Sequence, residues 1–344
     1  MMKKIGIVTI VTINYGNRLQ NYALQRVLEK LGYSVETLRR ESGIKGLKQR
    51  VKIIGQSLLH TKGAKFRSFN KNIHFAKETV TRDDYPKDLR NSYNYFIVGS
   101  DQVWNPHYDF VAGKCDFLVF ARENQKISYA ASFGVSEIPS ERKTEYAEYL
   151  KTFKAISVRE KQGSKIVEEL ADKKATVVLD PTLLIDEIEW KKVEKKPLFC
   201  PNKKYVFIYA LGDKTERFKD KINQLKKEYE IFDVRALQKN GKELPIGPSE
   251  FLYLIRNAEV ILTDSFHATV FSILFHKKFI TFNRSGLNMN SRIESLAELI
   301  GEKSRLTNCG DFDCETEIDY VKIDEILQEE RFNSIDFLKK SLSD

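Results

Sequence analysis

The chain has 344 residues, of which 42% are hydrophobic and 31% are charged, so it has enough apolar material for two globular cores. Its longest apolar run lies near residues 5–13 and is interrupted by threonines, which excludes a membrane-spanning helix there. The formal charge of +9 favours an anionic partner. No stretch combines dense Lys and Arg with aromatic residues in a nucleic-acid motif, which argues against nucleic acid.

The four cysteines, Cys115, Cys200, Cys309 and Cys314, contain no CxxC pair. Cys309 and Cys314 have no second pair or nearby histidine, so the spacing argues against a zinc site and fits reduced thiols. The amino terminus looks superficially like a signal peptide, but it is short, strand-like and runs into a polar loop. We therefore expect a cytoplasmic protein without a bound metal.

In the first half of the chain, apolar runs typical of buried parallel strands alternate with amphipathic helical patterns. The predicted strands are 5–13, 34–38, 94–98, 126–131, 155–158 and 176–179. Predicted helices cover about 19–31 and 141–153, and a third begins after Arg159-Glu160. This alternation predicts a Rossmann-like lobe over residues 1–186.

A basic stretch at about residues 43–81 interrupts that lobe, and its pattern is irregularly helical. Two interpretations fit the pattern. One is a solvated helical insertion, and the other is a surface that rests on the anionic headgroups of the inner membrane as a peripheral contact.

A second α/β series follows a Lys-rich segment, residues 187–203, which contains two prolines and is predicted to be a linker. The predicted strands of this second lobe, residues 204–322, are 205–210, 231–234, 260–262 and 279–282. Its predicted helices are 215–229, 249–257 and one that begins near 266. Residues 323–344 form a last amphipathic helix.

The stretch 259–283 carries the clearest chemical signal, because it reads as strand, tight turn, helix and strand. Asp264 and Ser265 are good N-cap residues, so the first free N–H groups of the helix would stabilise a phosphate or carboxylate. His267 would then be the ionisable side chain beside that anion. The alternative is a buried histidine that bonds a carbonyl group.

A second polar cluster follows the predicted strand 94–98, where Gly99 permits a sharp turn. Side chains beyond that turn project where open α/β sheets bind ligands. Hydrogen-bonding groups and an indole suit a sugar, although a turn with a buried tryptophan fits the same pattern. The candidate residues for binding a sugar, which would be the acceptor substrate, come from this turn and from the predicted first helix. They are Asn17, Gln20, Asn21, Ser100, Gln102, Trp104 and Asn105.

Several blocks together resemble the polysaccharide pyruvyl transferase family. They are residues 14–24, 98–106, 128–134, 157–160, 179–182 and 263–268. The most specific are Gly99-Ser-Asp-Gln-Val-Trp104 and Thr263-Asp-Ser-Phe-His267, and the match covers nearly the whole chain in order. The resemblance implies two Rossmann-like lobes facing a cleft, similar to the two-lobed (GT-B-like) glycosyltransferases. It also implies a C-terminal helix that returns to the first lobe.

The resemblance further implies transfer of the enolpyruvyl group of phosphoenolpyruvate onto a sugar, with formation of a pyruvate ketal and release of phosphate. The acceptor would be a bacterial surface polysaccharide or its lipid-linked oligosaccharide precursor. His267 would be the general acid, and Arg159 would hold the donor. Asp101 is the best candidate to accept a proton from the attacking hydroxyl group. No cofactor is required beyond the donor substrate.

One departure from the family pattern affects the donor site. Many members have Arg-Leu-His where this chain has Ser265, Phe266 and His267, so one arginine is missing. Arg284 or Arg292 in the following loop could replace its charge. Two other functions fit the same residues. One is a two-lobed glycosyltransferase that uses a sugar nucleotide, and the other is a non-catalytic sugar-binding relative.

Overall fold

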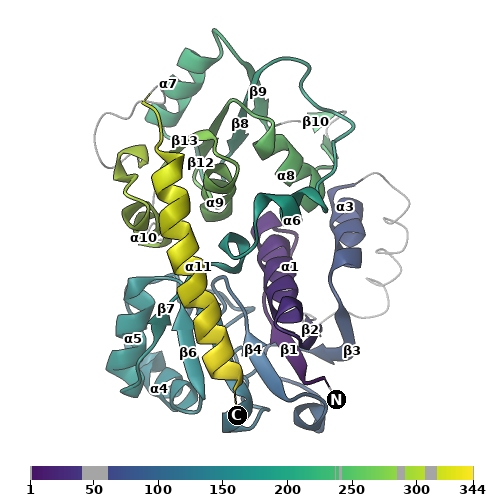
Figure 1. Ribbon diagram of the computed structural model, residues 1–344, viewed down its shortest axis with the longest axis vertical. Coiled ribbons are helices and arrows are strands. Elements are labelled where there is room, and N and C mark those ends of the chain that lie inside the picture. The colour runs from purple at the N-terminus through teal and green to yellow at the C-terminus, as the bar shows by residue number, and fades with distance from the viewer. Residues whose placement is uncertain are drawn as a thin grey trace. The chain divides into compact units, whose positions relative to one another are not determined.

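The computed structural model describes residues 2–40, 61–236, 238–239, 242–284, 291–306 and 316–343. Contacts divide the chain into two compact units, whose elements are labelled in Figure 1. Of the described residues, the first unit contains 2–40, 70–185 and 329–343. The second contains 61–69 and those between 186 and 328. Each unit is therefore assembled from more than one segment of the chain.

The first unit is built on a seven-stranded parallel sheet with the order β3-β2-β1-β4-β5-β6-β7. Its strands are β1 (Lys4–Val8), β2 (Ser34–Arg40), β3 (Phe75–Val80), β4 (Tyr95–Val98), β5 (Lys126–Ala131), β6 (Ala155–Val158) and β7 (Thr176–Val177). The chain builds outward from β1 to β3 and then returns to the other side of β1 with β4. The carboxyl ends of β1 and β4 therefore flank a topological switch point, where open α/β sheets bind ligands.

Two strands of this unit differ from the sequence-based expectation. β1 ends at Val8 rather than at residue 13, because Thr9 leaves the sheet and its hydroxyl group donates to the carbonyl of Ser100. β3 lies inside the stretch 43–81 that was expected to be helical. There Ala76 and Val80 are buried, and the strand pairs with β2. Residues 43–60 of that stretch lie outside the described residues.

The helices of the first unit are α1 (Tyr15–Lys30), α4 (Lys143–Lys151), α5 (Lys161–Ala171) and the second part of α11 (Tyr320–Leu342). Residues of α11 from 329 onward belong to this unit. Arg331 donates to the carbonyl of Leu183, and the hydroxyl group of Ser334 accepts from the backbone N–H of Leu179 at 3.0 Å. The last helix is therefore bonded to the segment that follows β7.

The second unit is built on a four-stranded parallel sheet with the order β13-β12-β8-β9. Its strands are β8 (Tyr205–Tyr209), β9 (Glu230–Asp233), β12 (Val260–Thr263) and β13 (Lys278–Thr281), and a small hairpin joins β10 (Gln238–Lys239) to β11 (Lys242–Glu243). Its helices are α3 (Lys62–Phe69), α6 (Glu187–Lys191), α7 (Glu216–Leu225), α8 (Pro248–Arg256), α9 (Phe266–Leu274) and α10 (Ser291–Leu299). The order reverses between β8 and β12, which places a second switch point at their carboxyl ends.

Two helices of the second unit come from segments that were interpreted differently in the sequence. α3 belongs to the predicted insertion of the first lobe, yet its Lys65 pairs at 2.5 Å with Glu250 near the start of α8. α6 lies in the predicted linker 187–203, and its Trp190 is buried with its ring edge-on to Phe271 at 5.0 Å. Among the described helices, none has both the length and the apolar composition needed to cross a membrane.

Candidate functional site

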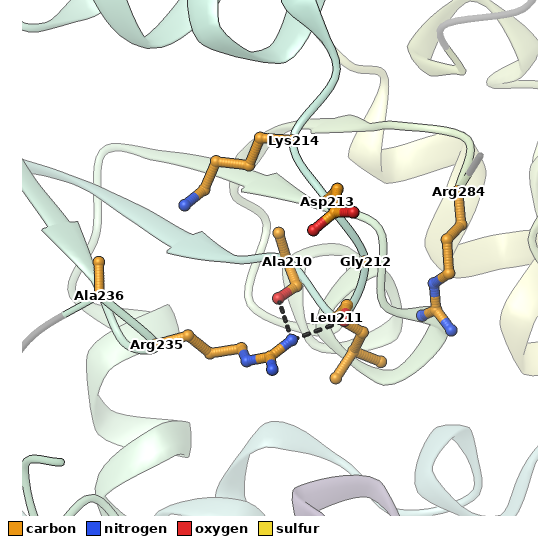
Figure 2. Close-up of a pocket in the computed structure, with 8 residues that line it drawn as sticks. All are labelled: Ala210, Leu211, Gly212, Asp213, Lys214, Arg235, Ala236 and Arg284. Atoms are coloured by element: carbon orange, nitrogen blue, oxygen red, sulfur yellow. Dashed lines mark hydrogen bonds between the residues drawn. The ribbon is translucent and has the colours of Figure 1, made fainter.

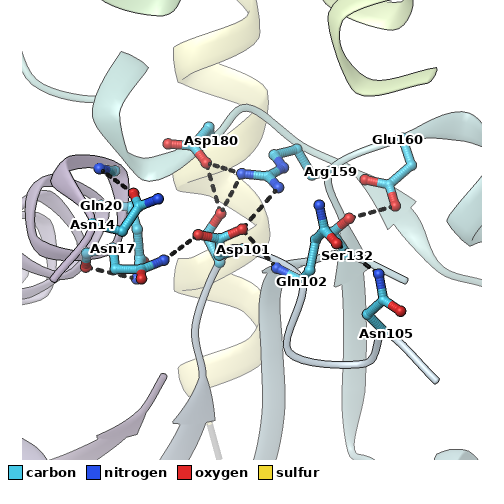
Figure 3. Close-up of polar contacts among 12 residues, drawn as sticks. Asn14, Asn17, Gln20, Asp101, Gln102, Asn105, Ser132, Arg159, Glu160 and Asp180 are labelled. Atoms are coloured by element: carbon cyan, nitrogen blue, oxygen red, sulfur yellow. Dashed lines mark hydrogen bonds and ion pairs between the residues drawn. The ribbon is translucent and has the colours of Figure 1, made fainter. Parts of the chain in front are cut away.

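Asp101 lies at the switch point of the first unit, directly after β4 (Figure 3). Its φ of 81° is in the left-handed region, which aspartate and asparagine tolerate better than most residues. One carboxylate oxygen accepts from the side-chain amide of Asn17 on the first turn of α1. The other accepts from the backbone N–H of Gln102 at 2.8 Å. The orientation of this carboxylate is therefore fixed from both sides.

Arg159 lies beside Asp101, and only 2% of its side chain is exposed. Its Nη1 donates to Asp180 at 2.8 Å and to the hydroxyl group of Ser100 at 3.3 Å, while Nη2 is 3.6 Å from an Asp101 oxygen. Burial lowers the pKa of Arg159, but the charges of Asp180 and Asp101 more than offset burial, so the pKa is raised overall. In this unit Arg159 is committed to two carboxylates. Its role in holding the donor, implied by the family resemblance, stays a prediction.

The residues predicted to contact an acceptor are brought together here, but most bond to the protein itself. Gln20 donates to the Thr9 hydroxyl group at 2.8 Å, and Asn21 accepts from the Thr37 hydroxyl group at 2.8 Å. Asn105 donates to the side-chain oxygen of Gln102 at 2.6 Å. Gln20, Asn21 and Ser100 are fully buried, and Asn17, Gln102 and Asn105 are nearly so. These side chains are therefore largely enclosed and bonded to neighbouring protein groups, and their role in binding an acceptor stays a prediction.

Trp104 needs the clearest correction, because its side chain is 0% exposed. Its ring stacks on Phe117 at 5.6 Å and also contacts Phe133 and Phe153. Its indole N–H donates to the carbonyl of Asp116 at 2.9 Å, which satisfies the one polar atom that the core must accommodate. A sugar ring cannot pack on this indole, so the alternative of a turn with a buried tryptophan is correct.

A stacked pair of aromatic residues, one partly buried and one exposed, lies in the loop after Trp104 and was missed by the sequence interpretation. The rings of Tyr108 and Phe110 stack at 5.4 Å with an interplanar angle of 10°, and Phe110 is 48% exposed. The loop closes on itself, because the backbone N–H of Ala112 donates to the carbonyl of Val103 at 3.0 Å. This pair therefore lies in a closed loop that begins directly after the segment of Asp101. Its sequence signal was two aromatic residues in a loop that follows a buried strand.

The switch point of the second unit begins with the turn that joins β12 to α9. Strand, turn and helix lie where the sequence predicted them. The hydroxyl group of Ser265 accepts from the backbone N–H of Ala268 at 3.5 Å, as expected for an N-cap. The hydroxyl group of Thr263 accepts from the backbone N–H of Ser265 at 3.0 Å. Local hydrogen bonds thus fix the start of α9.

Asp264 does not cap this helix but connects it to the loop after β8. Its two carboxylate oxygens accept from the backbone N–H groups of Leu211 at 2.6 Å and Gly212 at 2.7 Å. Nε of Arg284 lies 3.3 Å from the same carboxylate. A Cβ atom at Gly212 would lie 2.7 Å from Cγ of Arg284, so glycine is what allows this close approach. Asp264 therefore positions both the loop and Arg284.

These residues border a pocket of about 590 Å³ at the carboxyl edge of the second sheet (Figure 2). Its wall is formed by the segments that follow β8, β9 and β13. The lining residues are Ala210, Leu211, Gly212, Asp213, Lys214, Arg235, Ala236 and Arg284. Three of them are cations and one is an acid, so the pocket is suited to an anionic ligand.

Arg235 is the cation in this pocket whose bonding is the most informative. Its Nη1 donates to the carbonyls of Ala210 at 3.0 Å and Leu211 at 2.6 Å. Among the described residues, no carboxylate pairs with it. By contrast, Lys214 pairs with Asp233 at 2.5 Å, and Arg284 pairs with Asp264. Neutral carbonyls hold the Arg235 guanidinium in place, and no carboxylate in the described part of the chain neutralises its charge.

His267 lies on the first turn of α9, three residues after Asp264, and is 7% exposed. It does not line the pocket described above. Its ring is edge-on to Phe266 at 5.3 Å, and the guanidinium of Arg292 lies over the Phe266 ring at 5.9 Å. Of the two arginines considered as replacements at Ser265, Arg284 lines the pocket and Arg292 packs on an aromatic ring.

Lys214 and Arg235 were not among the predicted site residues. Both follow the carboxyl end of a predicted strand, which was the available signal. In the described part of the chain, no three His, Cys, Asp or Glu side chains gather in an arrangement that could hold a metal ion. Cys115 and Cys200 are free thiols, whereas Cys309 and Cys314 lie outside the described residues.

Comparisons with known proteins place this geometry in a wider context. The model of the polysaccharide pyruvyl transferase family matches residues 14–286. No curated protein matches the sequence. Among solved structures, the chain is similar to a UDP-GlcNAc 2-epimerase from Neisseria meningitidis bound to UDP-GlcNAc, with a TM-score of 0.51 and 12% identity over 99% of both chains.

Two further solved structures are similar at lower TM-scores. A UDP-N-acetylglucosamine 2-epimerase from Rickettsia bellii has a TM-score of 0.45 and 10% identity over 99% of both chains. The spinosyn forosaminyltransferase SpnP has a TM-score of 0.42 and 13% identity over 99% of this chain and 95% of its own. At such identities the likeness concerns the fold alone. The predicted fold class, α/β with two Rossmann-like parts similar to the GT-B-like enzymes, is confirmed.

Proposed function

Because this chain belongs to the polysaccharide pyruvyl transferase family, we propose that it transfers the enolpyruvyl group of phosphoenolpyruvate onto a sugar and releases phosphate. The observation that carries the choice of donor is the pocket at the carboxyl edge of the second sheet, which presents Lys214, Arg235 and Arg284. Phosphoenolpyruvate carries a phosphate and a carboxylate, and charge-assisted hydrogen bonds from guanidinium groups suit both.

Arg284 takes over the charge that the family places at the position of Ser265. Its guanidinium pairs with Asp264, the residue directly before Ser265, so a cation is present beside this turn although it comes from another segment. Arg235 supplies the second cation. Its hydrogen bonds to two neutral carbonyls orient the guanidinium without neutralising its positive charge.

His267 is the general acid in this proposal, as the family resemblance implies. It does not line the pocket itself, but it lies on the first turn of α9, three residues after Asp264, which holds the pocket loop and Arg284. Protonation of the methylene carbon of the donor creates an oxocarbenium-like centre at C2, which a sugar hydroxyl group attacks. The bond from C2 to the phosphate oxygen then breaks, and phosphate leaves. A second hydroxyl group of the sugar closes the ketal, so two hydroxyl protons balance the proton added to carbon and the one carried by phosphate.

Asp101 accepts the proton of an attacking hydroxyl group, and its carboxylate is held by Asn17 and Gln102 in one orientation. Buried Arg159 and Asp180 lie behind it and position it. The apolar face of a pyranose ring packs well on an aromatic side chain, so the exposed Phe110 with Tyr108 replaces Trp104 as the proposed sugar contact.

The test is phosphate release from phosphoenolpyruvate in the presence of synthetic and lipid-linked galactosides, mannosides and glucosides. We expect release that depends on both substrates. A rise in melting temperature with phosphoenolpyruvate alone would reflect donor binding, since a ligand of the native state stabilises it by mass action. A rise with sugar nucleotides but not with phosphoenolpyruvate would instead support a glycosyltransferase. A response to sugars alone would support a non-catalytic sugar-binding protein.

A further inference from the structure

A loop of the second unit, residues 195–204, combines exposed apolar side chains with lysines. Leu198 is 70% exposed and Phe199 is 39% exposed, which is unusual for large apolar residues that stand next to each other. The surrounding lysines, Lys195, Lys196, Lys203 and Lys204, are all exposed. An apolar tip between cations matches the chemistry of an anionic bilayer surface, where acyl chains lie beneath charged headgroups.

The ion pairs of this region leave a surplus of positive charge. Lys204 pairs with Glu259 at 3.5 Å, and on the preceding helix α6 Lys191 and Lys192 pair with Glu187 and Glu189. Two further acids lie near the loop: Glu194 pairs with Arg256, and Glu230 donates its backbone N–H to the carbonyl of Lys204 at 3.0 Å. Among the described residues, no carboxylate pairs with Lys195, Lys196 or Lys203. Three lysines that pair with no carboxylate in the described part of the chain therefore flank Leu198 and Phe199.

The base of the loop is fixed, so its tip is presented in a defined place. Val193 and Pro197 are buried, and the backbone N–H of Lys195 donates to the carbonyl of Ser249 at 3.1 Å. Pro197 directly precedes the exposed Leu198.

We propose that the loop 195–204 docks the protein on an anionic lipid bilayer, with Leu198 and Phe199 at the level of the headgroup–acyl boundary and Lys195, Lys196 and Lys203 against the headgroups. The site is distinct from the stretch 43–81, where the sequence pattern first suggested a lipid contact. The proposal does not rest on the pyruvyl transfer reaction. It holds or fails by binding measurements alone.

The test is sedimentation of the full chain with vesicles of phosphatidylcholine mixed about two to one with phosphatidylglycerol, compared with pure phosphatidylcholine. We expect binding to the mixed vesicles at low salt, and weakening as the ionic strength rises. Changing Lys195, Lys196 and Lys203 together to Gln should weaken binding by about 100-fold, since each lysine near such a surface contributes about 1 kcal/mol, or roughly fivefold. Leu198→Ser with Phe199→Ser should weaken it by about tenfold or more.

A matched control changes Lys87, Lys151 and Lys174 to Gln. These three lysines are exposed and lie in the first unit, and their replacement removes the same total charge as the loop variant. This control should bind within about twofold of the wild type. In addition, Leu198→Trp should bind and show a blue shift of its emission on the mixed vesicles. Wild-type protein that stays in the supernatant with the mixed vesicles, or a control that loses as much binding as the loop variant, would overturn the proposal. So would binding to heparin with none to vesicles, which would point to a soluble polyanion.

Discussion

The two switch points of this molecule are made by the same topology but use their charges in opposite ways. In the first unit, Arg159 is buried and pairs with both Asp180 and Asp101, so its charge is balanced by protein carboxylates. In the second unit, Arg235 is held by two neutral carbonyls, and its charge faces a pocket. The number of arginines near a sheet edge therefore does not identify an anion site. What identifies it is whether the acceptors of each arginine are charged or neutral.

The largest expected effect tests whether the protein's own carboxylates neutralise Arg159 at the first switch point. Asp180→Ala removes the main partner of a buried guanidinium, and such losses cost about 3–5 kcal/mol because the remaining charge stays desolvated. Urea unfolding of the variant measures the free energy. Asp213→Ala, at an exposed residue of the second unit, is the control and should change stability by less than about 0.5 kcal/mol. If Asp180→Ala lowered the free energy of unfolding by less than about 1 kcal/mol, the buried Arg159 would not need Asp180 to offset its charge.

His267 provides the next largest effect, which concerns turnover. His267→Gln should lower kcat by about 100-fold or more while phosphoenolpyruvate still binds, because a lost general acid affects the transition state rather than the ground state. Steady-state kinetics together with a donor thermal shift measures both quantities. Turnover within a few-fold of wild type would remove His267 from the mechanism.

Asp101 separates catalysis from donor binding. Asp101→Asn keeps a residue that tolerates the left-handed backbone conformation, so the change isolates the loss of the negative charge. We expect turnover to fall by about 100-fold with the donor affinity nearly unchanged. Arg159→Ala should act in the same direction if Arg159 positions Asp101. If it mainly weakens phosphoenolpyruvate binding, the donor role implied by the family resemblance is correct.

Substitutions of the cations at the second switch point test whether their charges are available to bind an anionic ligand. Arg235→Ala should weaken phosphoenolpyruvate binding by about 10- to 100-fold, which corresponds to about 1.5–3 kcal/mol for a hydrogen bond to a charged group. Arg284→Ala and Lys214→Ala should each cost less, because Arg284 is already paired with Asp264 and Lys214 with Asp233. Titration with phosphoenolpyruvate measures the three affinities. Equal losses for all three would show that general charge, and not the neutral anchoring of Arg235, decides binding.

The smallest expected effect concerns the acceptor. Phe110→Ala should raise the acceptor KM by about three- to tenfold, the scale of one aromatic contact, without changing the donor KM. Trp104→Phe is the control, because Trp104 is enclosed in the core and should change stability rather than the acceptor KM. The reverse pattern would restore Trp104 as the sugar contact.

Local sequence patterns were sufficient for most elements of the fold. The strand, turn and helix at 260–274 follow from a β-branched run, a serine N-cap and helical spacing, all of which act between near neighbours. The same holds for β4 and the sharp turn after it. The pattern failed at β3, because a short edge strand with only two buried residues is defined by its pairing with β2 rather than by its own composition.

What only the tertiary structure decided is which side chains keep their polar or apolar surfaces available. The sequence at Trp104 is the same whether the ring is exposed or enclosed, and its packing against Phe117, Phe133 and Phe153 makes it part of the core. Likewise, the sequence determined that arginines follow the strand ends, but not that Asp180 neutralises one while carbonyls anchor another. Burial and pairing depend on segments that are distant in the chain, and no local pattern encodes them.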